Sequence, residues 1–172
     1  NLLVSPNKPK SAFDFLSWAH EFGHMLGLSD IRNVRSASDQ DSSPLGVIDL
    51  MNSMVAPELL GWQRFLLGTI YDNQVNCLSK AGTYTSWITP IEARDKGVKV
   101  AVIPTGKYTA IAIESRRSYG FDSNLGSANR GLFVYQIDTT IPYGLSPIKV
   151  APSPTAKDNQ LRLDAEIGRA SC

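Results

Sequence analysis

Two histidines and a glutamate stand at a spacing that suits metal-dependent chemistry. His20, Glu21 and His24 form the pattern His-Glu-x-x-His in a stretch whose apolar residues recur at helical spacing. On a helix, both imidazoles lie on one face and can bind a single zinc ion, while the intervening glutamate faces the same cleft. Zinc lowers the pKa of a bound water and polarises a carbonyl, and Glu21 can pass the water's proton to a leaving amine. The pattern therefore predicts metal-assisted hydrolysis.

A third ligand is needed, and the sequence limits what it can be. A catalytic zinc site typically has three protein ligands and one open position. His20 and His24 are the only histidines in the chain, so a third ligand from this chain is a carboxylate or, less often, a tyrosine. We predict Asp30, because Gly27 lets the chain leave the helix sharply and return to the metal. Glu58 is the competing candidate, and a plain role for Asp30 in the loop stays open.

Helices and turns must position these residues. Apolar periodicity predicts a helix over residues 11–28, and the Ser/Asp-rich residues 29–44 predict a surface loop. The apolar residues 45–51 return the chain to the core before a turn. Pro57 suits the first position of a second helix, which we expect to continue to about residue 70 because its apolar residues are closely spaced.

The motif and its surroundings resemble a known group of peptidases. His-Glu-x-x-His-x-x-Gly-x-x-Asp over residues 20–30, with a methionine turn at residues 49–53, is similar to the metzincins. Leu60-Gly61-Trp62 and residues 131–138 narrow this to the immune inhibitor A family of secreted bacterial metallopeptidases. The chain departs from that family at Ser29, where a proline is usual, and the strands that precede the active-site helix in a metzincin have no counterpart in it.

The resemblance implies a zinc endopeptidase that hydrolyses peptide bonds in extracellular proteins. It implies Zn²⁺ on His20, His24 and Asp30, Glu21 as the general base, and Met51 as the apolar floor under the site. The implied partner is an extended polypeptide substrate, and the implied location is secreted or on the cell surface.

The expected fold class is α+β, in two parts. Residues 1–70 would be the C-terminal portion of a zincin-like or metzincin-like catalytic domain, with the active-site helix, the methionine turn and the following helix. Residues 71–172 would form a sandwich-like antiparallel β-rich domain. The strands expected there are rich in β-branched and aromatic residues and cover residues 83–91, 98–103, 107–114 and 131–138.

Composition and charge disfavour several other classes. The chain has 17 basic and 16 acidic side chains with no long run of like charge, which disfavours nucleic-acid binding. No apolar stretch approaches the roughly 18 residues that cross a bilayer. Residues 1–6 lack the pattern of a signal peptide, and we interpret the chain as a piece of a longer protein. Cys77 and Cys172 form either one disulfide or two unpaired thiols.

Other interpretations of the same residues stay open. The motif can arise by chance, and the chain can be a truncated or inactive peptidase-like module with a structural or protein-binding role. A zinc hydrolase acting on another acyl group is a third possibility. Tyr71 and Tyr119 are candidates for oxyanion stabilisation or for packing. Arg116 and Arg117 are interpreted as a solvated strand end in preference to a substrate clamp.

Overall fold

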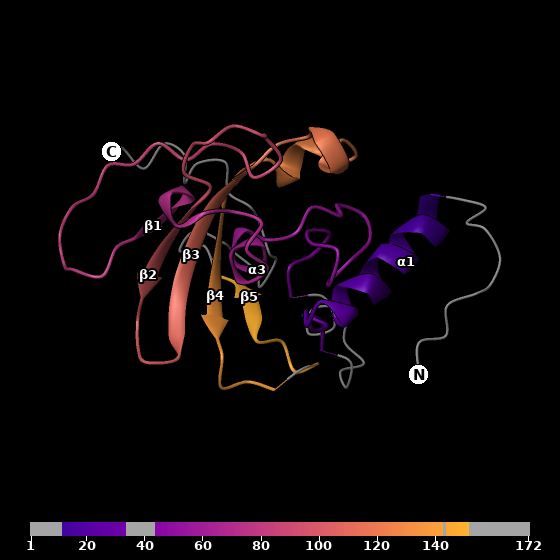
Figure 1. The fold of residues 1–172 in the computed structure, drawn as a ribbon, viewed down its shortest axis with the longest axis horizontal. Helices are drawn as coiled ribbons and strands as arrows, with labels where there is room; N and C mark the ends of the chain where they lie inside the picture. The colour runs from indigo at the N-terminus through magenta and orange to yellow at the C-terminus, as the bar shows by residue number, and fades with distance from the viewer. Residues whose placement is uncertain (1–11, 34–43, 143, 152–172) are drawn as a thin grey trace.

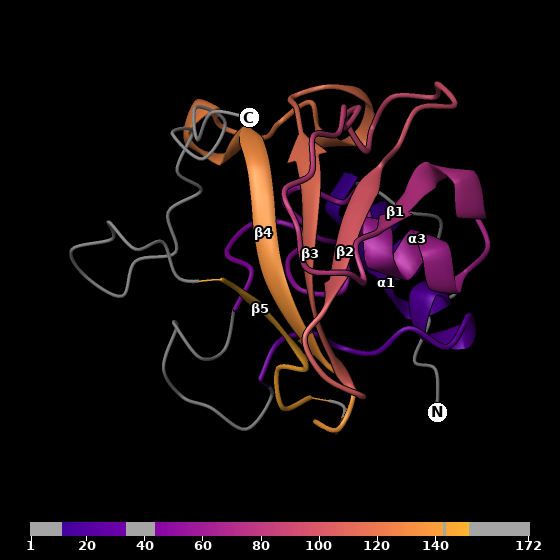
Figure 2. The same ribbon diagram turned by 90° about the vertical axis from the view of Figure 1, so that its left-hand side faces the viewer.

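A five-stranded sheet is the largest element of the computed structural model, which describes residues 12–33, 44–142 and 144–151. The strands are β1 (Val75–Cys77), β2 (Val100–Pro104), β3 (Thr109–Arg116), β4 (Gly131–Asp138) and β5 (Ile148–Val150). They lie side by side in sequence order, with β1 and β5 at opposite edges (Figure 2). β1 pairs with β2 in parallel, whereas the other three pairs are antiparallel, so the sheet is mixed.

β3 and β4 form the longest pair and give the sheet its buried face. Their register runs without a break from Thr109 opposite Asp138 to Arg116 opposite Gly131. Along β4 the buried side chains alternate with less buried ones, as the two-residue period of a strand requires. The buried members of that strand are Phe133, Tyr135 and Ile137.

Two helices of the described residues lie beside this sheet. α3 (Gly61–Leu66) rests on it directly: the Trp62 N–H donates to the Tyr135 hydroxyl at 3.2 Å. α1 (Ala12–Met25) lies farther away, and residues 44–60 run between α1 and the strands (Figure 1). None of the described helices is long and apolar enough to cross a membrane.

The expected fold class is wrong. Instead of a mainly helical catalytic part followed by an antiparallel β-rich domain, the described residues form a mixed sheet with two helices and little helical content. The apolar core draws residues from both sides of position 70. Those ahead of position 70 include Leu28, Ile31, Met51 and Leu60, and those after it include Val100, Ala112, Phe133 and Ile148. The boundary proposed near residue 70 stays a prediction.

The second helix is much shorter than expected, because buried carboxylates hold the chain ahead of it. The backbone N–H groups of Glu58, Leu60 and Gly61 donate to side chains of Asp122, Asp49 and Glu114, at 2.9, 2.9 and 2.6 Å. Residues 57–60 are therefore not helical, and the helix begins at Gly61. These three acceptors lie 11 to 64 residues away in the sequence, outside the helical segment, so local helical periodicity did not reveal them.

The strand predictions were partly right. β4 has the predicted bounds, and β2 and β3 overlap residues 98–103 and 107–114. The strand expected over residues 83–91 is wrong: no strand forms there, Trp87 is 92% exposed, and only Pro90 makes an isolated bridge, to Ser115. β1 and β5 were missed because three residues are too few to show a period of two.

Arg116 is fully buried, which corrects its interpretation as a solvated strand end. Its guanidinium donates to the Glu58 carbonyl at 2.9 Å and lies 3.4 Å from Glu114 and 3.5 Å from Asp122. Arg116 thereby neutralises two carboxylates that hold the residues ahead of α3. A buried charge needs partners of this kind, because an unpaired one costs several kcal/mol.

Candidate metal centre

The helix α1 carries both histidines of the motif on its last turns. Their imidazole rings lie edge to face, with centroids 4.8 Å apart. The His20 side chain is 12% exposed and the His24 side chain 30% exposed. Glu21 lies next to His20 on the same helix and is partly exposed, and no described residue forms a hydrogen bond or ion pair with its carboxylate. The site is therefore open to solvent on one side.

Gly27 ends the helix as the sequence predicts. It adopts φ +93°, a left-handed conformation that favours glycine, and its N–H donates to the His24 carbonyl at 3.0 Å. The next residue donates its N–H back to the Gly23 carbonyl at 3.0 Å. The chain therefore reverses directly after α1. Buried Leu28 and Ile31 then anchor it on both sides of Asp30.

Asp30 returns to the two histidines. Its Oδ1 lies 3.3 Å from His20 Nε2, and its Oδ2 lies 3.9 Å from His24 Nε2. One ligand atom from each of the three residues lies within 4.8 Å of the others. In a tetrahedral zinc site with bonds of about 2.0 to 2.1 Å, the ligand atoms lie about 3.3 to 3.4 Å apart. The His20–Asp30 separation matches that value, and the His24–Asp30 separation is wider.

Both histidines present the correct nitrogen for binding a cation. His20 Nδ1 lies 2.9 Å from the Leu50 carbonyl oxygen, and His24 Nδ1 lies 2.9 Å from the Leu28 carbonyl oxygen. A carbonyl can only accept, so each Nδ1 carries a proton, and in the neutral ring each Nε2 then has a lone pair for a cation. This second contact also fixes the ring orientation, as it does for metal-binding histidines in general.

The carboxylate of Asp30 also fits a bound cation. Its Oδ1 is buried and has no hydrogen-bond partner among the described residues, although the Arg32 guanidinium lies 3.6 Å away. A buried oxygen without a donor is costly, and a cation shared with the two Nε2 atoms would satisfy it. Two imidazoles and a carboxylate are a donor set that zinc accepts.

Met51 lies beneath the motif. It is fully buried, as predicted, and packs against Gly23 in the middle of the motif. A Cβ at position 23 would lie 2.6 Å from Met51 Sδ, so any larger residue there must displace the thioether. Met51 also receives the Ile31 N–H on its carbonyl at 3.1 Å. This residue therefore supports both the helix and the returning chain.

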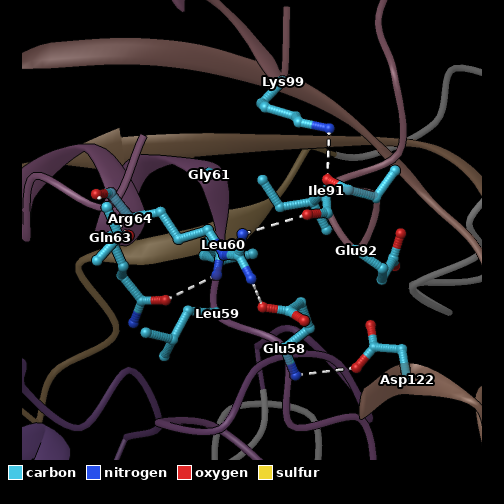
Figure 3. A network of polar contacts seen from close by, with 12 residues as sticks. Glu58, Leu59, Leu60, Gly61, Gln63, Arg64, Ile91, Glu92, Lys99 and Asp122 are labelled. Atoms are coloured by element: carbon cyan, nitrogen blue, oxygen red, sulfur yellow. Dashed lines mark hydrogen bonds and ion pairs between the residues drawn. The ribbon is translucent and has the colours of Figure 1, made fainter. Parts of the chain in front are cut away.

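The other candidates lie elsewhere. Glu58, the rival third ligand, forms an ion pair with the Arg64 guanidinium, whose Nη1 also donates to the Ile91 carbonyl at 3.2 Å (Figure 3). Tyr71 and Tyr119 are 72% and 60% exposed. Together with Glu58 they line a cavity of about 840 Å³ whose lining includes none of the four motif residues. Within the described residues, Asp30 is the carboxylate that joins the histidines.

Comparisons with family models, with curated proteins and with solved structures find no match to this chain. The resemblance to the immune inhibitor A family therefore stays a prediction that rests on the residues of the motif.

Sequence reasoning missed Asp49, which is completely buried next to the site. The sequence offered one signal, a charged residue inside the apolar run of residues 45–51. Burial raises the pKa of the Asp49 carboxyl to about 6, although the Leu60 N–H and Arg116 oppose the shift. Burial also raises the pKa of Glu92, to about 7. Both groups thus lose their protons less readily in the folded chain than in the unfolded one.

These raised pKa values predict that the chain is more stable at mildly acidic than at neutral pH. Below about pH 4 both states hold the Asp49 proton, and above pH 6 the folded state carries the cost of the buried charge. Asp49 alone should lower the free energy of unfolding by about 2 kcal/mol between pH 4 and pH 7. Urea unfolding of the metal-free chain should show a higher midpoint at pH 5 than at pH 7. An equal or lower midpoint at pH 5 would contradict the prediction, and Asp49→Asn should weaken the pH dependence.

Proposed function

We propose that this chain carries the zinc-binding centre of a hydrolase that cleaves peptide bonds. The observation that supports this best is the convergence of His20 Nε2, His24 Nε2 and the Asp30 carboxylate, with both Nδ1 atoms already engaged by backbone carbonyls. Three protein ligands leave a fourth position free, which is the arrangement of a catalytic rather than a structural zinc site. The proposal rests on this site and not on a zincin fold.

Each residue of the motif then has a distinct task. His20, His24 and Asp30 hold the cation, and the two carbonyls behind the imidazoles keep the rings in place. A zinc ion bound there would supply Lewis acidity, which lowers the pKa of a coordinated water and polarises the scissile carbonyl. The Glu21 carboxylate accepts the proton that the attacking water loses and gives it to the leaving amine.

The choice of substrate rests on the sequence. The motif residues with Met51 and Gly27 resemble the immune inhibitor A family, and this supports polypeptides as substrates and a secreted or cell-surface location. The partial exposure of His24 and Asp30 is compatible with an extended chain that approaches from solvent.

Protein binding without turnover is the second candidate, and one observation favours it. Phe15, Phe22 and Met25 on α1 are each more than half exposed, and Phe15 and Phe22 are seven residues apart on the same helix face. Exposed apolar side chains grouped in this way often mark a surface that another protein covers. The chain would then be a peptidase-like module whose helix serves an interface.

Removal of the metal separates the two candidates. If the proposal is right, dialysis against a chelator should abolish cleavage of an unstructured protein such as casein, and one equivalent of zinc should restore it. Circular dichroism of the metal-free chain would verify that it remains folded. Cleavage that persists in the chelator would contradict a metal-dependent mechanism. Bound zinc without any cleavage would favour the binding module.

A further inference from the structure

The turn of residues 49–53 contacts the metal centre in three places. The Leu50 carbonyl accepts the His20 Nδ1 proton at 2.9 Å. The Met51 thioether packs against Gly23, between the two histidines in the sequence. The Met51 carbonyl accepts the Ile31 N–H at 3.1 Å, directly after the third proposed ligand. A displacement of this turn would therefore move both a histidine and the carboxylate segment.

Asp49 holds this turn in its conformation. Its side chain is 0% exposed, and its φ of +78° is a left-handed value that aspartate tolerates better than most residues. Its Oδ1 accepts the Met51 N–H at 2.7 Å, and its Oδ2 accepts the Leu60 N–H at 2.9 Å. Its main-chain carbonyl accepts the N–H groups of Asn52 and Ser53, at 3.1 and 2.7 Å. Asp49 thus forms hydrogen bonds within residues 49–53 and also links this turn to Leu60, directly ahead of α3.

Gln63 on α3 completes the arrangement. Its Nε2 donates to Asp49 Oδ1 at 3.3 Å, and its Oε1 accepts the Leu60 N–H at 2.9 Å. Both oxygens of the Asp49 carboxylate therefore accept hydrogen bonds: Oδ1 from Met51 and Gln63, and Oδ2 from Leu60. Because these groups are buried, loss of Oδ1 as an acceptor leaves the Met51 N–H without a partner, whereas the Leu60 N–H can still donate to Gln63 Oε1.

We propose that Asp49 is a positioning residue of the metal centre, which fixes the turn whose carbonyls orient His20 and the chain at Asp30. The inference rests on the proposed zinc site, and Asp49 itself touches neither the metal ligands nor the reacting atoms. In Asp49→Asn, one oxygen becomes an NH₂ group that faces a backbone N–H, so either the turn or the start of α3 must shift. The His20 ring then loses its fixed acceptor.

Asp122 offers a closely matched control. Asp122 is also 0% exposed, and its Oδ1 accepts the Glu58 N–H at 2.9 Å (Figure 3). Glu58 lies two residues before Leu60, whose N–H donates to Asp49. The Asp122 carboxylate also lies 3.5 Å from the Arg116 guanidinium and forms a side-chain hydrogen bond with Glu92. Asp122→Asn therefore makes the same chemical change in a buried carboxylate that holds the same segment, and the turn of residues 49–53 keeps its own hydrogen bonds.

The test is zinc affinity of the full chain at pH 7, measured against a chromophoric chelator, together with the visible spectrum of the Co²⁺-loaded protein. Asp49→Asn should lower zinc affinity by about tenfold or more and change the Co²⁺ bands. Mutation of the groups that hydrogen-bond to metal ligands typically lowers metal affinity by about 10- to 100-fold. Asp122→Asn should stay within about twofold of wild type with an unchanged spectrum. A purely structural role would instead lower urea stability in both variants and leave both metal readouts unchanged.

The outcomes are distinguishable. Wild-type zinc affinity in folded Asp49→Asn, or an equal loss in Asp122→Asn, would overturn the positioning role and leave the zinc site intact. A wild-type chain that binds no zinc would overturn both the proposed function and this inference. If Asp49→Asn does not fold, Gln63→Met removes one donor to the same carboxylate. Gln63→Met should lower zinc affinity about threefold, which is less than the loss expected when a direct hydrogen-bond partner of a metal ligand is removed. Unchanged zinc affinity in this variant would overturn the positioning role of Asp49.

Discussion

Replacing Glu21 by glutamine is expected to abolish peptide cleavage while zinc stays bound. The amide has nearly the same shape as the carboxylate but cannot take up a proton, so the reaction loses its general base. General acid–base catalysis contributes about 10²- to 10⁴-fold, and the cleavage rate should fall by that factor. Zinc affinity should not change, because the ligand atoms belong to His20, His24 and Asp30. The measurements are hydrolysis of a fluorescent peptide and zinc content by atomic absorption.

Asp14→Asn provides the control for this variant. It neutralises a carboxylate in the first turn of the same helix, away from the motif, and should retain both zinc and cleavage. Undiminished cleavage by Glu21→Gln would remove this residue from the mechanism. A loss of zinc together with cleavage would mean that Glu21 supports the site rather than moving a proton.

The second large effect is expected at the third ligand. Asp30→Ala should lower zinc affinity by more than the roughly 10- to 100-fold that loss of an outer partner costs, because a ligand atom itself is removed. Glu58→Ala should leave zinc affinity unchanged, since Glu58 pairs with Arg64 and lines a different cavity. Calorimetric zinc titration of both variants decides between the two carboxylates. A loss of affinity in Glu58→Ala but not in Asp30→Ala would show that the assignment is reversed.

The arrangement at the motif could be predicted because it depends on local geometry. Four residues make about one helical turn, so the spacing of His20 and His24 brings their rings together once α1 forms. The return of Asp30 depends on Gly27, whose left-handed conformation is a property of that residue type. His20, His24 and Asp30 lie within eleven residues of the chain, so their approach to one another follows from local geometry, whereas the contacts with Leu50 and Met51 that hold them come from farther along the chain.

The fold could not be predicted in the same way, because distant side chains decide where its elements begin. The helix expected from Pro57 starts only at Gly61, since Asp49, Asp122 and Glu114 bind the N–H groups ahead of it. These acceptors lie up to 64 residues away in the sequence. Helical periodicity in residues 57–70 carries no information about them.

Residue composition also failed to predict which segments become strands, because a strand needs a neighbouring strand to pair with. Residues 83–91 have the β-branched and aromatic content of a strand, yet only an isolated bridge forms there. Conversely, the three residues of β5 form a strand because β4 offers a free edge beside them. Sheet membership depends on neighbours more than on intrinsic preference.

The measurement that tests the account most directly is the zinc content of the purified chain, compared with that of a His20→Ala, His24→Ala double variant. We expect one zinc ion per wild-type chain and none in the double variant, because both Nε2 atoms of the centre are removed. A wild-type chain without zinc, or a double variant that keeps its zinc, would contradict it.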